Sequence, residues 1–103
     1  MIIENIELNI AVDTETGLIR RLDKDRWWKG SKANKQGHLN VSIHNRKHYV
    51  HRLVWELAKG PIPKDKIIDH INGDPTDNRL SNLRPLSNVY NLHRHKWLKS
   101  NPT

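Results

Sequence analysis

The segment 66–96 most constrains the fold, because its pattern predicts two short strands followed by a helix. The apolar pair at 67–68 begins the first strand, and the residues at 72–75, Asn-Gly-Asp-Pro, favour a turn. A second strand is predicted at 83–86, where a proline confines it to a sheet edge or to the end of the strand. A serine then offers a good N-cap for a helix over 87–98.

Four polar residues in this segment combine a general base with metal ligands. His70 can accept a proton near neutral pH, and the adjacent Asp69 offers a hard anionic oxygen to a divalent cation. Asn91 adds a neutral oxygen, and His95 lies one helical turn further along on the same helix face. Neighbouring side chains of a strand point to opposite faces, so Asp69 and His70 share a site only at a strand end or bulge. An activated water and a cation at the phosphate are what phosphodiester hydrolysis requires.

Each of these residues has a simpler interpretation when it is taken alone. An Asp-His pair is common in loops, and Asn82 is typical of a turn that bonds its own backbone. Asn91 and His95 are ordinary on the surface of a basic helix. The prediction therefore depends on order and spacing, with Asn82 12 residues after His70 and Asn91 nine residues after Asn82.

The segments that carry these residues resemble HNH endonucleases of the phage and intron-homing type. The resemblance covers roughly residues 38–98, and the matching residues form continuous motifs rather than a scattered pattern. They read His51-Arg-Leu-Val-Trp55, Ile68-Asp-His-Ile-Asn-Gly73, Asn78-Arg-Leu-Ser-Asn-Leu-Arg84 and Asn88-Val-Tyr-Asn91.

The resemblance implies a ββα-metal fold and single-metal cleavage of DNA that leaves 5′-phosphate and 3′-hydroxyl ends. It implies His70 as general base, Asp69 and Asn91 as metal ligands, and Asn82 as the residue that braces the loop. Many relatives have His where this chain has Asn91, and an oxygen-rich ligand set favours Mg²⁺ or Mn²⁺ over Zn²⁺. Whether His95 also ligates the single metal ion stays open.

The charge distribution indicates a polyanionic partner. The net charge is +7, and residues 1–15 contain four acidic residues and no Lys or Arg, so the remaining chain carries all 18 basic residues against seven acidic ones. Release of counterions from phosphates gives such a surface sequence-independent affinity for nucleic acid. The absence of cysteine excludes disulfides and thiolate zinc sites.

The N-terminal half has the periodicity of an antiparallel sheet. We predict strands at 6–12, 18–22 and 39–43, a hairpin turn at 44–47, a further strand at 48–50 and a helix from about 51 to 60, with 23–37 as a loop. Four histidines gather near this hairpin, and both a zinc site and structural hydrogen bonding are open for them: His38, His44, His48 and His51.

Basic and aromatic side chains beside the predicted loop suit contact with DNA phosphates and bases. The candidates are Arg20, Arg21, Arg26, Trp27 and Lys29, together with Arg84 and Arg94, which flank the predicted site. The alternative is that these are solvated surface charges and that the tryptophan packs on the core.

We therefore expect an α+β protein with an N-terminal antiparallel sheet and a helix, followed by the ββα-metal (HNH) motif. At 103 residues it is expected to be a single domain, with a DNA-contacting β region at 1–50, the nuclease core at 51–98 and a polar tail at 99–103. A catalytically inactive DNA-binding module and an RNA-directed nuclease are the alternatives. We expect a cytoplasmic protein with no membrane span, as a monomer or a homodimer.

Overall fold

The structure is a computed structural model that describes residues 1–87. In chain order the elements are β1 (Ile2–Asn5), β2 (Ile10–Asp13), β3 (Ile19–Arg21), β4 (Ser31–Lys32), β5 (Leu39–Ile43), β6 (Arg46–Tyr49), α1 (Val50–Lys59), β7 (Lys66–His70), the 3₁₀ helix η1 (Leu80–Asn82) and β8 (Leu83–Ser87). Within the described residues the strands form three antiparallel sheets, in the orders β1-β2-β3, β4-β5-β6 and β7-β8.

The first sheet corrects the prediction of one continuous strand over 6–12. Residues 6–9 form a turn between β1 and β2, and the buried strand begins only at Ile10. The turn forms because the side-chain oxygen of Asn5 accepts the backbone N–H of Leu8 at 2.9 Å and Asn9 adopts a positive φ of 55°. Asparagine tolerates that conformation better than most residues, so local turn chemistry overrides the alternating pattern here.

The second sheet is close to expectation. β5 and β6 pair through a tight turn in which His44 and Asn45 both have positive φ, the geometry that favours two-residue hairpins. The predicted loop at 23–37 is wrong in one detail, because Ser31 and Lys32 pair with β5 as the short strand β4. Backbone pairing across an exposed edge leaves no hydrophobic periodicity, so the sequence gives no sign of it.

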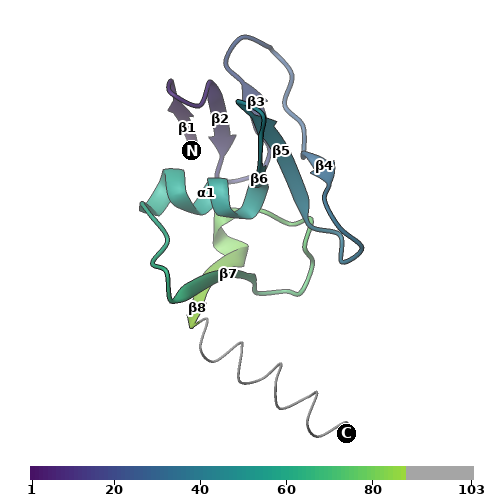
Figure 1. Ribbon diagram of the computed structural model, residues 1–103, viewed down its shortest axis with the longest axis vertical. Helices are drawn as coiled ribbons and strands as arrows, with labels where there is room; N and C mark the ends of the chain where they lie inside the picture. The colour runs from purple at the N-terminus through teal and green to yellow at the C-terminus, as the bar shows by residue number, and fades with distance from the viewer. Residues whose placement is uncertain (88–103) are drawn as a thin grey trace, which may run out of the picture.

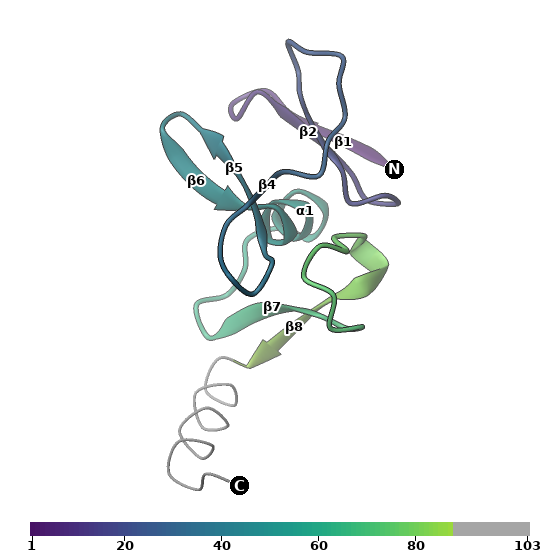
Figure 2. The same cartoon turned by 90° about the vertical axis from the view of Figure 1, so that its right-hand side faces the viewer.

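The helix α1 lies between the two N-terminal sheets and the β7–β8 pair (Figures 1 and 2). The helix lies against strands of all three sheets. It ends at Gly60, whose φ of 97° ends the helix, as the Gly-Pro pair predicts. A single core cluster joins the helix to the sheets: Ile10, Val12, Ile19, Leu39, Val41, Ile43, Val50, Leu53, Val54, Ile68 and Leu83.

The strands β7 and β8 pair along their full length, with His70 opposite Leu83. The described residues thus have a mixed α and β architecture with one helix and several antiparallel sheets, which confirms the coarse fold class. Ser87, the predicted N-cap of a helix over 87–98, is the last residue of β8, and the remainder of that predicted helix, with Asn91, Arg94 and His95, lies outside the described residues. Within residues 1–87, no helix combines the length and apolarity that crossing a bilayer would require.

Candidate active site

His70 is the last residue of β7, and its side chain turns toward the interior. The residue is 8% exposed, and its Nε2 lies 2.7 Å from Oδ1 of Asn78, which is itself 1% exposed. Burial alternates along the strand, so Ile68 and His70 face inward together. The imidazole is therefore held at the point where the strand gives way to the following loop.

Asp69 lies on the other face of β7, as the strand pleat requires. Its side chain is about one-third exposed, and Arg84, its partner across the sheet, donates from Nε to Oδ2 at 3.0 Å. The two neighbouring residues thus diverge at the strand end, with the carboxylate toward solvent and the imidazole toward the core. This exposed cross-strand pair contributes little to stability on its own.

Asn82 ties together the loop that follows His70. Its Nδ2 donates to Oδ1 of Asn72 at 3.0 Å and to the carbonyl oxygen of Asp77 at 2.9 Å, and its Oδ1 accepts the N–H of Asn72 at 3.0 Å. Its carbonyl oxygen also accepts the N–H of Ile71 at 2.8 Å. The residue is 6% exposed, so these bonds are largely shielded from water.

The remainder of the loop is held by its own side chains. Arg79 donates from Nε and Nη2 to the two oxygens of Asp77 at 2.8 and 2.7 Å, and these bonds lower the pKa of Asp77 to about 2. Asp77 also accepts from the side chain of Asn72 at 2.9 Å. The connection from His70 to η1 is therefore a fixed loop with an internal hydrogen-bond network.

Two further histidines, His51 and His38, lie next to His70. The ring centroids of His51 and His70 are 5.0 Å apart, and His38 lies 5.5 Å from His51 and 5.9 Å from His70. Nδ1 of His51 is buried without a hydrogen-bond partner among the described residues. Burial, followed by the nearby charges of His70, His38 and Arg52, lowers the pKa of His51 from 6.5 to about 3.

The lowered pKa of His51 predicts a loss of stability in mild acid. Below pH 6.5 the unfolded chain binds a proton at His51 that the folded state excludes. The free energy of unfolding therefore keeps its full value above that pH and falls as the pH is lowered toward 3. We expect the free energy of unfolding to fall by about 2 kcal/mol from pH 7 to pH 5 through this residue. Urea unfolding of the wild type and of His51→Gln at both pH values measures it. Equal pH dependence in the two proteins would refute the assignment.

Residues 1–87 contain one of the predicted metal ligands, Asp69. Within that range no group of three or more His, Cys, Asp or Glu side chains is arranged to hold a metal ion. His38, His44, His48 and His51, for which the sequence left a zinc site open, are therefore not part of such a group among the described residues. The donor that Asp69 offers, a partly exposed carboxylate at a strand end, is chemically suited to Mg²⁺ or Mn²⁺ but is insufficient alone.

Some of the predicted DNA-contacting residues bond to other groups of the protein, whereas others are exposed. Arg20 donates to the carbonyl oxygen of Lys24 at 2.8 Å and lies over the ring of Trp27, 5.4 Å from its centroid. Arg21 donates to the carbonyl oxygen of Ser42 at 3.0 Å. Arg26 and Lys29 are exposed. Beside them lies a surface groove lined by Arg21, Lys24, Arg26 and Trp28.

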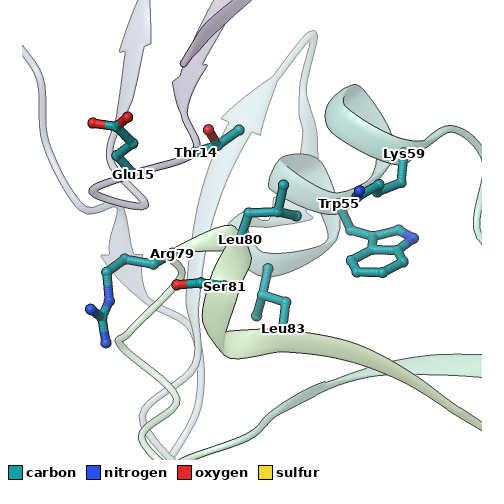
Figure 3. A pocket seen from close by; sticks show the side chains of 8 residues that line it. All are labelled: Thr14, Glu15, Trp55, Lys59, Arg79, Leu80, Ser81 and Leu83. Atoms are coloured by element: carbon teal, nitrogen blue, oxygen red, sulfur yellow. The ribbon is translucent and has the colours of Figure 1, made fainter.

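A separate groove lies behind η1 and does not include His70, Asp69 or Asn82 (Figure 3). It is formed by the turn after β2, the C-terminal half of α1 and the start of β8. Its lining residues are Thr14, Glu15, Trp55, Lys59, Arg79, Leu80, Ser81 and Leu83. Leu80 and Ser81 of η1 line this groove, whereas the side chain of Asn82 is directed into the loop.

Sequence reasoning did not place Asn78, His38 or His51 beside His70, and for the two histidines it left open only a zinc site or structural hydrogen bonding. Asn78 lies inside a quoted motif, but nothing in its spacing separates it from the other asparagines of the loop. His51 stands in the first turn of α1 and His38 just before β5, so only the tertiary packing of α1 against β5 and β7 brings their rings to His70.

Comparison with known proteins gives a consistent family signal. The model of a family described as HNH endonuclease matches residues 48–93. "Protein 3.8" of Escherichia phage T7 is 49% identical over 49 residues, which are 45% of this chain and 40% of that protein.

The fold also has a counterpart among solved structures. A structure titled "DNA binding and cleavage by the HNH homing endonuclease I-HmuI" superposes with a TM-score of 0.65 at 21% sequence identity. The match covers 85% of this chain and 52% of that chain. At this identity the likeness shows a shared fold. The chain spans about half the length, or less, of the relatives that it matches.

Proposed function

Residues 48–93 belong to the HNH endonuclease family, and on that premise we propose that the chain is a metal-dependent endonuclease that nicks or cleaves DNA. The products are 5′-phosphate and 3′-hydroxyl ends. The observation that carries the proposal is the fixed position of His70 at the end of β7, beside Asp69 and a loop tied together by Asn82. Binding to DNA alone would need none of this arrangement.

In this proposal His70 is the general base. A neutral imidazole accepts a proton from water near pH 7, and a buried, hydrogen-bonded ring does so in a defined orientation. Asn82 acts indirectly, because its bonds to Asn72 and Asp77 hold the loop that begins directly after His70. We propose that the helix expected from the sequence over 87–98, most of which lies outside the described residues, completes the ββα-metal arrangement.

One divalent ion, Mg²⁺ or Mn²⁺, is proposed as the cofactor, with Asp69 and Asn91 as its ligands and His95 as a candidate third. When bound, such an ion polarises the phosphate and stabilises the charge on the leaving oxygen. Asp69 presents its carboxylate to solvent and shares Oδ2 with Arg84, so the guanidinium holds the carboxylate in place. Arg84 and Arg94 are also proposed to contact phosphate.

Residues 1–50 are proposed to contact DNA, and residues 51–98 to form the nuclease core. Arg26 and Lys29 are exposed beside Trp27, which suits them to the phosphate backbone. Arg20 and Arg21 bond to the protein's own carbonyl groups, so we assign them a smaller share of that contact. The match to a phage protein supports a phage origin for this chain.

The test is conversion of supercoiled plasmid to open circles or linear DNA. We expect cleavage with Mg²⁺ or Mn²⁺ and none with EDTA, because the proposed chemistry requires a divalent ion. Open circles alone indicate nicking by a single site, whereas linear products indicate paired sites. A structured RNA is the parallel substrate. Tight DNA binding without cleavage under any metal would refute the enzyme and favour the binding module, and cleavage of RNA alone would replace DNA as substrate.

A further inference from the structure

We propose that Asn78 is a positioning residue for His70, and that its side-chain oxygen keeps the imidazole proton on Nε2 and the lone pair on Nδ1. This inference rests on the proposed function of His70 as a general base. It adds a residue that acts on the orientation of the base and that is distinct from Asn82, which holds the loop.

The hydrogen bond between the two side chains carries the inference. The distance from Nε2 of His70 to Oδ1 of Asn78 is 2.7 Å, and the two residues are 8% and 1% exposed. An amide oxygen only accepts, so Nε2 is the donor in this pair. In a neutral imidazole the other ring nitrogen then carries the lone pair, and the hydrogen bond on one nitrogen sets the role of the other.

The protonated state of the base, rather than any contact of the amide nitrogen of Asn78, favours the same orientation. Nδ2 is buried and has no hydrogen-bond partner among the described residues. Turning the amide over would place this NH₂ group against Nε2. A base that has taken a proton carries N–H groups on both nitrogens, so the turned amide would then oppose donor to donor. With Oδ1 toward the ring, Asn78 accepts from His70 in both protonation states.

Neighbouring rings limit how His70 can turn. His51 lies 5.0 Å and His38 5.9 Å from it between ring centroids, both at tilted angles. These contacts restrict the position of the imidazole but do not choose between its two tautomers. Among the described residues, Asn78 is the partner that makes this choice.

The turn between β2 and β3 holds the backbone of Asn78 from the other side. Gly17 has a φ of 74°, and a Cβ added there would lie 2.5 Å from the carbonyl carbon of Asn78 and 2.7 Å from the N of Arg79. The carbonyl oxygen of Thr14 accepts the N–H of Leu80 at 2.9 Å. Figure 3 shows Thr14 and Glu15 of this turn beside Arg79 and Leu80. The N-terminal sheet thereby fixes the residue that orients the base.

The tautomer can be measured without DNA or metal. In the full-length, ¹⁵N-labelled protein with EDTA, two-bond ¹H–¹⁵N correlations distinguish the protonated nitrogen of each imidazole from the one with the lone pair. The sample is held at about pH 8.5, roughly two units above the usual histidine pKa. The signals of His70 are those missing in His70→Gln. We expect a single tautomer with the proton on Nε2, slow to exchange with water.

Two variants of Asn78 separate the hydrogen bond from packing. Asn78→Leu keeps similar bulk but offers no acceptor, so we expect mixed tautomers, a rapidly exchanging imidazole proton and cleavage slower by about 10–100-fold. Asn78→Asp keeps an oxygen that accepts, so we expect it to retain the wild-type tautomer. If Asn78 had a purely structural role, the cleavage rate of each variant would follow its stability, and the two variants would not differ in the tautomer of His70.

A glycine pair tests the supporting turn. Gly17→Ala and Gly60→Ala both place a side chain at a positive φ, but a Cβ at position 60 meets nothing within 4 Å. We expect only the first to produce mixed tautomers at His70. The inference is overturned if the wild type carries the proton on Nδ1, or if Asn78→Leu keeps both the tautomer and the cleavage rate. A wild type that does not cleave DNA refutes the proposed function, whereas the tautomer measurement still decides the role of Asn78.

Discussion

Replacing His70 with alanine is expected to slow metal-dependent plasmid cleavage by about 10²–10⁴-fold, the usual contribution of a positioned general base. The ring stands at the end of β7, and within the described residues its Nε2 bonds to Asn78. Without the ring, water at the phosphate has no base held in position to accept its proton. The measurement is the initial rate of open-circle formation at saturating Mg²⁺ and at fixed protein concentration.

Two controls separate this chemical loss from a loss of folding. Removing a buried ring leaves a cavity, so His70→Gln, which fills more of the space, is measured beside the alanine variant. His48→Ala replaces a half-buried histidine of β6 that is neither part of the catalytic site nor one of the side chains proposed to contact DNA, and it is expected to keep the wild-type rate. If both His70 variants were folded and cleaved DNA at the wild-type rate, another group would have to be the base.

The sequence predicted the C-terminal half of the described fold better than the N-terminal half. Apolar pairs, the Gly-Pro pair that ends the helix and the turn-forming residues at 72–75 predicted bounds for α1, β7 and β8 that are close to the observed ones. The first strand was misplaced because the side chain of Asn5 and the positive φ of Asn9 create a turn within an alternating pattern. β4 was missed because two exposed residues pair through their backbones alone.

The candidate site, like the fold, could be predicted from the sequence only in part. Asp69 and His70 diverge because of the strand pleat, whereas from the sequence we expected the strand end and the turn after it to let them share a site. The contact between His70 and Asn78 spans eight residues of irregular loop, and the contact with His51 depends on helix packing. Neither has a periodicity from which it can be predicted, so these contacts required the three-dimensional structure.

Asn82→Leu is expected to destabilise the protein by about 3 kcal/mol, because three shielded hydrogen bonds of the side chain are lost at about 1 kcal/mol each. Leucine is similar in size to asparagine, so the loss reflects hydrogen bonding more than volume. For a chain of this length the melting temperature should fall by roughly 10–20 °C. Thermal unfolding followed by circular dichroism measures it. Ser81→Ala, an exposed neighbour in η1, is the matched control and is expected to stay within about 0.5 kcal/mol of the wild type.

The same variant distinguishes a brace for the loop from a general contribution to stability. The N–H groups of Ile71 and Asn72 are bonded directly to the backbone and side-chain oxygens of Asn82. If Asn82 holds the loop, the amide of Asn72 loses its acceptor in Asn82→Leu and should exchange with solvent faster than amides of β5. Cleavage should fall at temperatures where the variant is still folded, because the loop that begins after His70 is no longer fixed. Uniform acceleration of exchange across all strands, with cleavage following the folded fraction alone, would contradict the brace.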